Sequence, residues 1–148
     1  MEIRTKSTNI SGLLSLSPSS NIEIAFSLSP QSIIDLYEEL LDKNKIRVIK
    51  HQGKNFRSSG HLLLCNLFGL DEEKRNEVIL KLADKGISTN VHYKPLPMFT
   101  AYKKIGFDIN DYPNAYNKYS NEITLPLYTL LNNEDIEYVA AKINEILN

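Results

Sequence analysis

The chain has 148 residues, with 17 Lys plus Arg, 18 Asp plus Glu and 42% hydrophobic residues, so its net charge at pH 7 is -1. This length is typical of one domain, which buries about two thirds of the surface that its unfolded chain would expose. A nearly neutral chain has no positive field to attract nucleic acid or an acidic membrane. No apolar run approaches the ~20 residues that a membrane-spanning helix needs. A single cysteine excludes an internal disulfide and a four-cysteine zinc site, and we expect a cytoplasmic protein without a signal peptide.

Residues 1–29 show no sustained hydrophobic period. One brief alternation, at Ile22, Ile24 and Phe26, predicts one strand at most in this part of the chain. We therefore divide the chain into a poorly patterned lead-in, 1–29, and a folded domain, 30–148.

A helix is predicted over residues 30–42. Ser29 can cap its N-terminus, and Pro30 can take the first helical position, where a missing N–H costs nothing. The apolar residues that follow recur at helical spacing and mark one face: Ile33, Leu36, Tyr37, Leu40 and Leu41. We expect that face to be buried.

Two strands and a second helix are predicted next. Residues 46–50 have strand character, and the nearly continuous apolar run at 61–68 suits a central strand. The segment between them, 51–60, is a polar connection. Asp71 can cap the following helix, which Gly86 ends. The buried face of that helix is expected to carry Val78, Ile79 and Leu82.

Residues 87–93 are predicted to form a further strand. That strand cannot continue into 94–99, because Pro95 and Pro97 each remove a hydrogen-bond donor and fix φ. We therefore expect the strand to end in a stiff extended loop.

The last third of the chain predicts two helices and one strand. Pro113 opens a short helix that reaches about Asn121, and a short strand follows until Pro126 stops it. Asn132 or Asn133 caps the last helix. Its apolar face carries Ile136, Val139, Ala140, Ile143, Ile146 and Leu147. Strands and helices intermix along the chain, which indicates an α+β or α/β fold with helices over a sheet of about four strands.

The sequence offers little support for a metal site or a cysteine nucleophile. His61 and Cys65 stand four residues apart on a predicted strand and therefore face the same side. A zinc site needs three or four ligands, and no further ligand completes the set at motif spacing. We interpret Cys65 as a small buried hydrophobe and His61 as a residue at a strand end. No glycine-rich phosphate-binding motif is present.

Two other groups of polar and aromatic residues are candidates for binding. In the segment 90–99, a strand delivers His92, Tyr93 and Lys94 into a proline-braced loop, which can present these side chains rigidly. The alternative is a strand end whose His92 and Tyr93 only satisfy local hydrogen bonds. Three tyrosines of the short helix lie at helical spacing and either stack on a sugar or base or pack on the core: Tyr112, Tyr116 and Tyr119.

The segments 86–107 and 111–128 together carry a combination of short motifs. These are KGI at 85–87, VHY at 91–93, PLPM at 95–98, AY at 101–102, GF at 106–107 and TLPLY at 124–128. In this combination the sequence resembles the C-terminal domain of the DegT/DnrJ/EryC1/StrS family, pyridoxal-phosphate-dependent aminotransferases that act on nucleotide-linked keto-sugars. Met98 stands where many relatives have a second His.

The resemblance implies an α+β fold with a small, mostly antiparallel sheet covered by helices, like the C-terminal small domain of fold type I pyridoxal-phosphate-dependent aminotransferases. In the intact family enzymes, a lysine of the large N-terminal domain forms the Schiff base with pyridoxal phosphate. None of the motifs of that domain is present in this sequence. We therefore expect no catalytic, cofactor-binding or metal-binding residue here, and no pyridoxal phosphate bound to this chain alone.

The resemblance also implies a place for the substrate. In the intact enzymes the HY segment faces the substrate side, so His92 and Tyr93 would contact the sugar or its diphosphate, with Asn90 and Lys94 flanking them. An imidazole, a phenol and an ammonium at a rigid strand end suit a hydroxylated, anionic ligand.

The sequence thus predicts the C-terminal, substrate-capping part of a sugar aminotransferase of amino-sugar or surface polysaccharide biosynthesis, inactive by itself. The expected partners are a nucleotide-linked sugar, a large catalytic domain on another chain and a second copy in a homodimer, but no nucleic acid and no membrane. Two alternatives are a free-standing small-molecule binding or regulatory module derived from that domain, and a purely structural or oligomerising domain.

Overall fold

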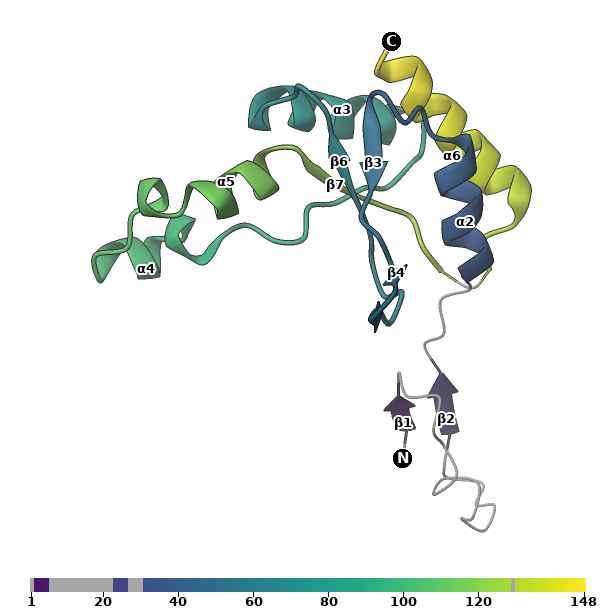
Figure 1. The fold of residues 1–148 in the computed structure, drawn as a ribbon, viewed down its shortest axis with the longest axis horizontal. Coiled ribbons are helices and arrows are strands. Elements are labelled where there is room, and N and C mark those ends of the chain that lie inside the picture. The colour runs from purple at the N-terminus through teal and green to yellow at the C-terminus, as the bar shows by residue number, and fades with distance from the viewer. Residues whose placement is uncertain (1, 6–22, 27–30, 129) are drawn as a thin grey trace.

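The computed structural model describes residues 2–5, 23–26, 31–128 and 130–148 (Figure 1). The capping roles expected of Ser29 and Pro30 lie outside the described residues. In the lead-in, strand β1 (Glu2–Thr5) pairs in parallel with β2 (Glu23–Phe26). The sequence predicted one strand at most there, and that expectation was wrong. The first strand has a single apolar side chain and so shows no alternation, but ladder pairing joins backbone groups, which every residue type carries.

The domain is built on a three-stranded antiparallel sheet in the order β3-β6-β7. The strands are β3 (Ile46–Val48), β6 (Leu63–Leu67) and β7 (Glu122–Leu125), and β6 is central, as its apolar run predicted. The long helices are α2 (Gln31–Leu40), α3 (Glu72–Asp84) and α6 (Asn133–Ile146). Helix α2 lies beside α6, and α3 packs against α6 and β7 (Figure 1). The α+β fold with a small antiparallel sheet is confirmed.

One face of the sheet forms the core with these helices. The register pairs Ile46 with Leu67 and Cys65 with Ile123, so alternate residues of the three strands point to the same side. The buried residues of the helices join this face in one cluster: Ile33, Ile34, Tyr37, Val78, Leu82, Ile136, Val139, Ala140 and Ile143. The helical periods read from the sequence identified most of these residues, but they missed Ile34. Five predicted residues are only partly buried against the cluster: Leu36, Leu40, Ile79, Ile146 and Leu147.

The opposite face of the sheet is largely polar. Arg47, Asn66 and Glu122 lie side by side in one row of the register, and Leu64 pairs with Thr124 in the next row. Asn66, Glu122 and Thr124 are nevertheless buried. Buried polar groups are usually hydrogen-bonded, so this face requires partners from the segments that cover it.

Residues 87–93 do not form the predicted strand, and the sheet has three strands rather than four. Only an isolated bridge joins Asn90 to Thr124 of β7, through backbone hydrogen bonds of 3.2 and 2.7 Å. Side chains take the next two amide protons: Val91 N–H donates to Asn90 Oδ1 and His92 N–H donates to Glu122 Oε2, each at 2.8 Å. These bonds compete with a backbone ladder, which explains why the strand stops at one bridge.

The expected extended loop after this segment is also wrong. Residues Leu96–Met98 form the short 3-10 helix η1, and α4 (Thr100–Lys104) follows at once. Met98 N–H donates to the carbonyl of Pro95 at 2.9 Å. Proline fixes φ near a value that suits the first turn of a helix as well as an extended chain, so its presence alone did not decide between the two.

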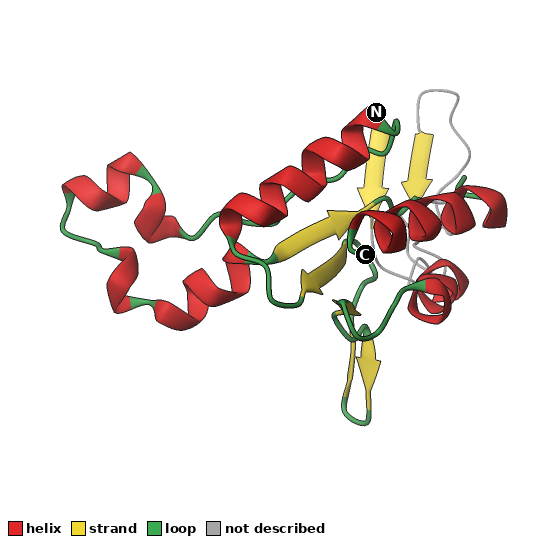
Figure 2. Ribbon diagram, turned by 90° about the horizontal axis from the view of Figure 1, so that it is seen from above, coloured by secondary structure: helices red, strands yellow, loops and turns green. Residues whose placement is uncertain are grey.

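The remaining elements project from the sheet. The polar connection 51–60 contains a small antiparallel hairpin, β4 (Gln52–Gly53) and β5 (Phe56–Arg57), which the sequence did not predict. Helices α4 and α5 (Pro113–Ser120) extend away from α2 and α6 in both views (Figures 1 and 2), with the 3-10 helix η2 (Ile109–Asp111) between them. We call this projecting segment, residues 94–120, the arm.

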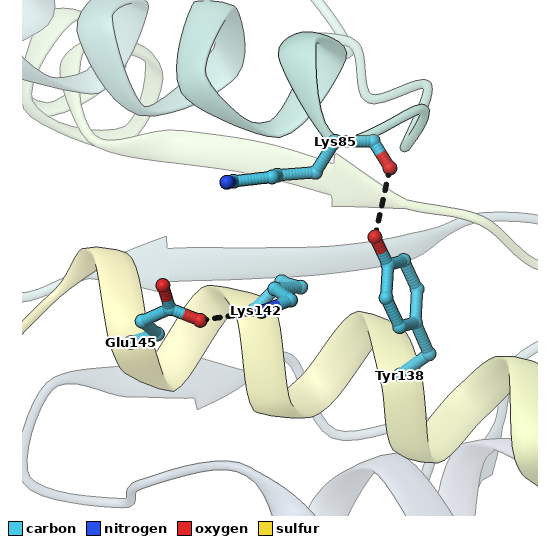
Figure 3. Close-up of polar contacts among 4 residues, drawn as sticks. All are labelled: Lys85, Tyr138, Lys142 and Glu145. Carbon is cyan, nitrogen blue, oxygen red and sulfur yellow. Dashed lines mark hydrogen bonds and ion pairs between the residues drawn. The ribbon is translucent and has the colours of Figure 1, made fainter.

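Local hydrogen bonds fix the ends of the helices. Asp71 Oδ1 accepts from Lys74 N–H at 2.9 Å, and Asn132, one of the two predicted caps, accepts from Asp135 N–H at 2.8 Å. Tyr138 Oη donates to the carbonyl of Lys85 at 3.1 Å, which ties α6 to the C-terminal end of α3 (Figure 3). Among the helices of the described residues, none combines the length and apolar character needed to cross a membrane.

Candidate functional site

His92 lies where the chain leaves the edge of β7, on the polar face of the sheet. Its backbone N–H donates to Glu122 Oε2 at 2.8 Å, and its ring Nδ1 lies 2.8 Å from Thr124 Oγ1. The side chain is partly buried. Both the backbone and the imidazole of His92 are thus anchored to the same strand, which gives the ring a defined orientation.

Glu122 and Thr124 are buried behind this histidine. Thr124 Oγ1 donates to Glu122 Oε1 at 2.7 Å, so each carboxylate oxygen of Glu122 accepts one hydrogen bond. Burial raises the pKa of Glu122, while the bonds from Thr124 and from His92 N–H act in the opposite direction. We call these three connected residues, His92, Thr124 and Glu122, the His92 network.

Arg75 of α3 holds the start of β7 in place. Its Nη1 donates to the carbonyl of Glu122 at 2.9 Å and to that of Tyr119 at 3.2 Å. The guanidinium lies over the ring of Tyr119, 4.9 Å from the centroid, and the whole residue is only 1% exposed. Arg75 therefore joins α3, the end of α5 and β7 beneath the His92 network.

A second group of polar contacts covers the same face of the sheet. Lys118 Nζ donates to Asn66 Oδ1 at 2.7 Å, and Asn66 Nδ2 donates to Asn121 Oδ1 at 2.7 Å. Burial lowers the pKa of Lys118, and the positive charge of Arg47 lowers it further. These bonds satisfy the buried polar group of the central strand.

The structure brings only part of the predicted site together. Tyr93 lies beside His92 with an edge-to-face ring contact of 4.7 Å between centroids, and it is 72% exposed. Asn90 accepts from the next backbone N–H, and its backbone bridges Thr124. Lys94 Nζ lies 5.9 Å from the centroid of the Phe99 ring. His92 and Tyr93 therefore form one accessible surface, whereas the side chains of Asn90 and Lys94 contact their own segment.

Sequence reasoning missed Glu122, Thr124 and Arg75. Arg75 precedes Val78 and Leu82 by three and seven residues, so it lies on the predicted buried face of its helix. A charged residue at such a position was a signal that the core contains a polar contact. Glu122 and Thr124 alternate with apolar residues in a short strand, which predicts that both point to the same face.

The tyrosines predicted on the short helix, of which Tyr112 lies just before α5, do not act as one surface. Tyr119 packs on Arg75 and donates its hydroxyl to Glu72 Oε1 at 2.7 Å, and burial followed by this bond raises its pKa. Tyr116 Oη donates to the other oxygen of Glu72 at 3.4 Å; Tyr116 is 37% exposed and Tyr112 is 40% exposed. Of the two roles predicted for these tyrosines, stacking on a sugar or base and packing on the core, Tyr119 has the second.

Other candidate chemistry lies apart from His92. Cys65 is fully buried and burial raises its pKa, which confirms its interpretation as a small hydrophobe. Within the described residues, no group of three His, Cys, Asp or Glu side chains could hold a metal ion.

A cavity of about 490 Å³ lies between α2 and β3, lined among others by Glu38, Arg47 and His51, and His92 does not border it.

A small antiparallel sheet covered by helices is also the fold of one part of solved pyridoxal-phosphate-dependent aminotransferases. Residues 25–144 match the DegT/DnrJ/EryC1/StrS aminotransferase family. This match spans most of the chain, so the chain belongs to that family.

Relatives of known name agree with this assignment. The chain is 33% identical over 97 residues to the spore coat polysaccharide biosynthesis protein SpsC of Bacillus subtilis, covering 62% of this chain and 24% of that protein. It is 34% identical over 91 residues to the UDP-4-amino-4,6-dideoxy-N-acetyl-beta-L-altrosamine transaminase of Campylobacter jejuni, with coverage of 62% and 24%. The chain therefore spans about a quarter of the length of these relatives.

Solved structures show the same relation. A proposed sugar aminotransferase of Streptococcus pneumoniae, Spr1654, superposes with a TM-score of 0.76 and 41% sequence identity, over 78% of this chain and 29% of that chain. The aminotransferase PseC of Helicobacter pylori, at 23% identity and a TM-score of 0.69, shares the fold. The described domain thus corresponds to less than a third of each of these enzymes.

Proposed function

We propose that this chain supplies the substrate-side part of a pyridoxal-phosphate-dependent sugar aminotransferase of amino-sugar or surface polysaccharide biosynthesis. The observation that carries the proposal is the His92 network, which holds an imidazole in a fixed orientation beside an exposed Tyr93 in a chain of this family. One relative is named for transamination of a UDP-linked amino sugar, which supports a nucleotide-linked sugar as the ligand.

The chemistry of the site fits such a ligand. An imidazole and a phenol offer hydrogen bonds and a ring surface to a sugar, and Lys94 contributes a positive charge next to them in the sequence. The role of these residues is to bind and orient the sugar. Glu122 holds the backbone of His92 and Thr124 holds its ring, so His92 is already oriented before a ligand binds.

Lys118, the lysine whose pKa burial lowers, does not fit a covalently held pyridoxal phosphate. An aldimine requires an unprotonated lysine amine that is free to react. Burial lowers the pKa of Lys118, but its ammonium donates to Asn66 Oδ1 at 2.7 Å and so serves the sheet. We propose that the lysine that holds the cofactor lies on a large domain supplied from outside these residues.

The surface of the arm supports docking to such a domain. Seven large apolar or aromatic side chains from the His92 segment and the arm are exposed: Tyr93, Leu96, Phe99, Ile105, Phe107, Tyr112 and Tyr116. An apolar surface of this kind is typical of an interaction site. It favours a domain that works against a partner, either the large domain or a second copy, over a free-standing binding module, which would carry polar residues there.

Calorimetric titration with UDP-N-acetylglucosamine tests whether His92 contributes to binding. We expect His92→Ala to weaken binding about tenfold, because it removes a preorganised hydrogen bond worth on the order of 1.4 kcal/mol. His61→Ala, at an exposed histidine outside the His92 network, is the matched control and should bind like the wild type. Equal affinities of the wild type and His92→Ala would contradict the proposed site. Binding lost equally in both variants would contradict it as well.

A further inference from the structure

The single hydroxyl proton of Thr124 decides how the His92 network is protonated. An ionised carboxylate is an acceptor only, so the 2.7 Å contact between Thr124 Oγ1 and Glu122 Oε1 uses the Thr124 proton. Thr124 Oγ1 then has only lone pairs left for His92 Nδ1, 2.8 Å away. The imidazole must donate in that contact, which means that its proton is on Nδ1.

The other ring nitrogen faces away from this network. Within the described residues, His92 Nε2 has no hydrogen-bond partner, and it is not among the buried polar atoms that lack one. It is therefore open to solvent. In a neutral ring whose Nδ1 carries the proton, Nε2 has a lone pair and accepts hydrogen bonds.

Several contacts keep Glu122 in the acceptor role. Its second oxygen accepts from His92 N–H at 2.8 Å, so both oxygens meet donors. Its carbonyl accepts from Arg75 Nη1 at 2.9 Å, which fixes the strand from which the carboxylate projects. A protonated Glu122 could donate only to Thr124 Oγ1, because the amide proton of His92 cannot accept. Burial raises the pKa of Glu122, but the bonds from Thr124 and His92 N–H and the positive charge of Arg75 favour the ionised carboxylate, which accepts at both oxygens.

We propose that Thr124 and Glu122 are positioning residues that hold His92 as the Nδ1–H tautomer, so that Nε2 accepts a hydrogen bond from a hydroxyl of the sugar. The hydrogen bond between Nε2 and a sugar hydroxyl rests on the proposed function. It makes that function more specific, because an acceptor nitrogen pairs with a hydroxyl donor, whereas a diphosphate offers only acceptor oxygens. His92 thus contacts the sugar and not the diphosphate of a nucleotide-linked sugar.

Nitrogen-15 NMR of the histidine rings in the full chain tests the positioning role without any ligand. The spectra are recorded at the alkaline end of a titration, where the ring shifts no longer change with pH, and His92→Ala assigns the signals. We expect the wild type to show protonated Nδ1 and unprotonated Nε2 at His92. Thr124→Val should lose this preference, and Thr124→Ser should restore it, while the His61 ring stays unchanged in both.

A wild-type His92 protonated on Nε2 would overturn the positioning role, and this result needs no variant to fold. A Thr124→Val protein with the wild-type tautomer would overturn it too. The same Nε2 signal tests the proposed hydrogen bond from the sugar. Its chemical shift should change on addition of UDP-N-acetylglucosamine but not on addition of UDP. An equal change with UDP would show a phosphate contact and overturn the proposal that His92 contacts the sugar. An Nδ1–H tautomer with no shift on adding the sugar would contradict the proposed function and leave the positioning role standing.

Discussion

Replacement of Arg75 by alanine is expected to lower the free energy of unfolding by about 3 kcal/mol, measured by urea denaturation of the full chain. The change leaves the carbonyl of Glu122 without the Arg75 donor, removes one of the two donors to the carbonyl of Tyr119, and empties the space beside the Tyr119 ring. A buried acceptor without a partner costs about 1–3 kcal/mol, and the lost packing adds to that cost.

Arg47 provides the matched control for Arg75. It is an exposed arginine whose guanidinium also lies near an aromatic ring, 5.7 Å from the centroid of Phe68. Arg47→Ala should lower the free energy of unfolding by less than about 1 kcal/mol, as exposed cation–π contacts do. If the two alanine variants were equally stable, Arg75 would not join the helix and strand as described.

Leu63→Ala is expected to cost about 2–5 kcal/mol of stability, because it leaves a cavity in the single core cluster. Leu63 begins the central strand and is 0% exposed, whereas Leu80 on α3 is 66% exposed. The same truncation at Leu80 should change stability by less than about 0.5 kcal/mol. Thermal and urea unfolding of both variants measure the difference. A Leu80 variant as unstable as the Leu63 variant would show that the helices do not cover the face of the sheet assigned to the core.

Hydrophobic period and capping residues were enough to predict most of the domain. The helices α2, α3 and α6 and the strands β3, β6 and β7 were each expected from local patterns, because each has one apolar face and clear end signals such as Asp71 and Asn132. Most of the core-facing residues followed from the same patterns, with Ile34 as an exception. These features depend on neighbours in the sequence, which is why the sequence could predict them.

The site was only half predictable, because its geometry depends on contacts between distant segments. His92 and Tyr93 were identified as candidates, but the segment that carries them was expected to be a strand. Its amide protons instead bond to the side chains of Asn90 and Glu122, and the second of these partners lies 30 residues away in the chain. Glu122 and Thr124 became part of the site only because β7 runs past His92.

Pro95, Pro97 and Lys94 show in the same way that local sequence does not specify contacts made in the folded chain. Pro95 and Pro97 predicted an extended loop after residues 87–93, but the segment forms a short 3-10 helix in which Met98 N–H donates to the Pro95 carbonyl. Lys94 is expected to flank the ligand, and its ammonium lies near the Phe99 ring, which the sequence did not predict. The position of a long, flexible side chain is decided by the surface around it, which the local sequence does not specify.

The central claim is that these residues form the substrate side of a sugar aminotransferase. It is tested most directly by a chimera in which residues 25–144 replace the matching segment of the Campylobacter jejuni transaminase, assayed for amino transfer to its UDP-linked sugar. We predict that the chimera transfers the amino group and that it loses most of its kcat/KM on His92→Ala, but not on His61→Ala. A chimera that folds, binds pyridoxal phosphate and transfers the amino group equally well with and without His92 would contradict it.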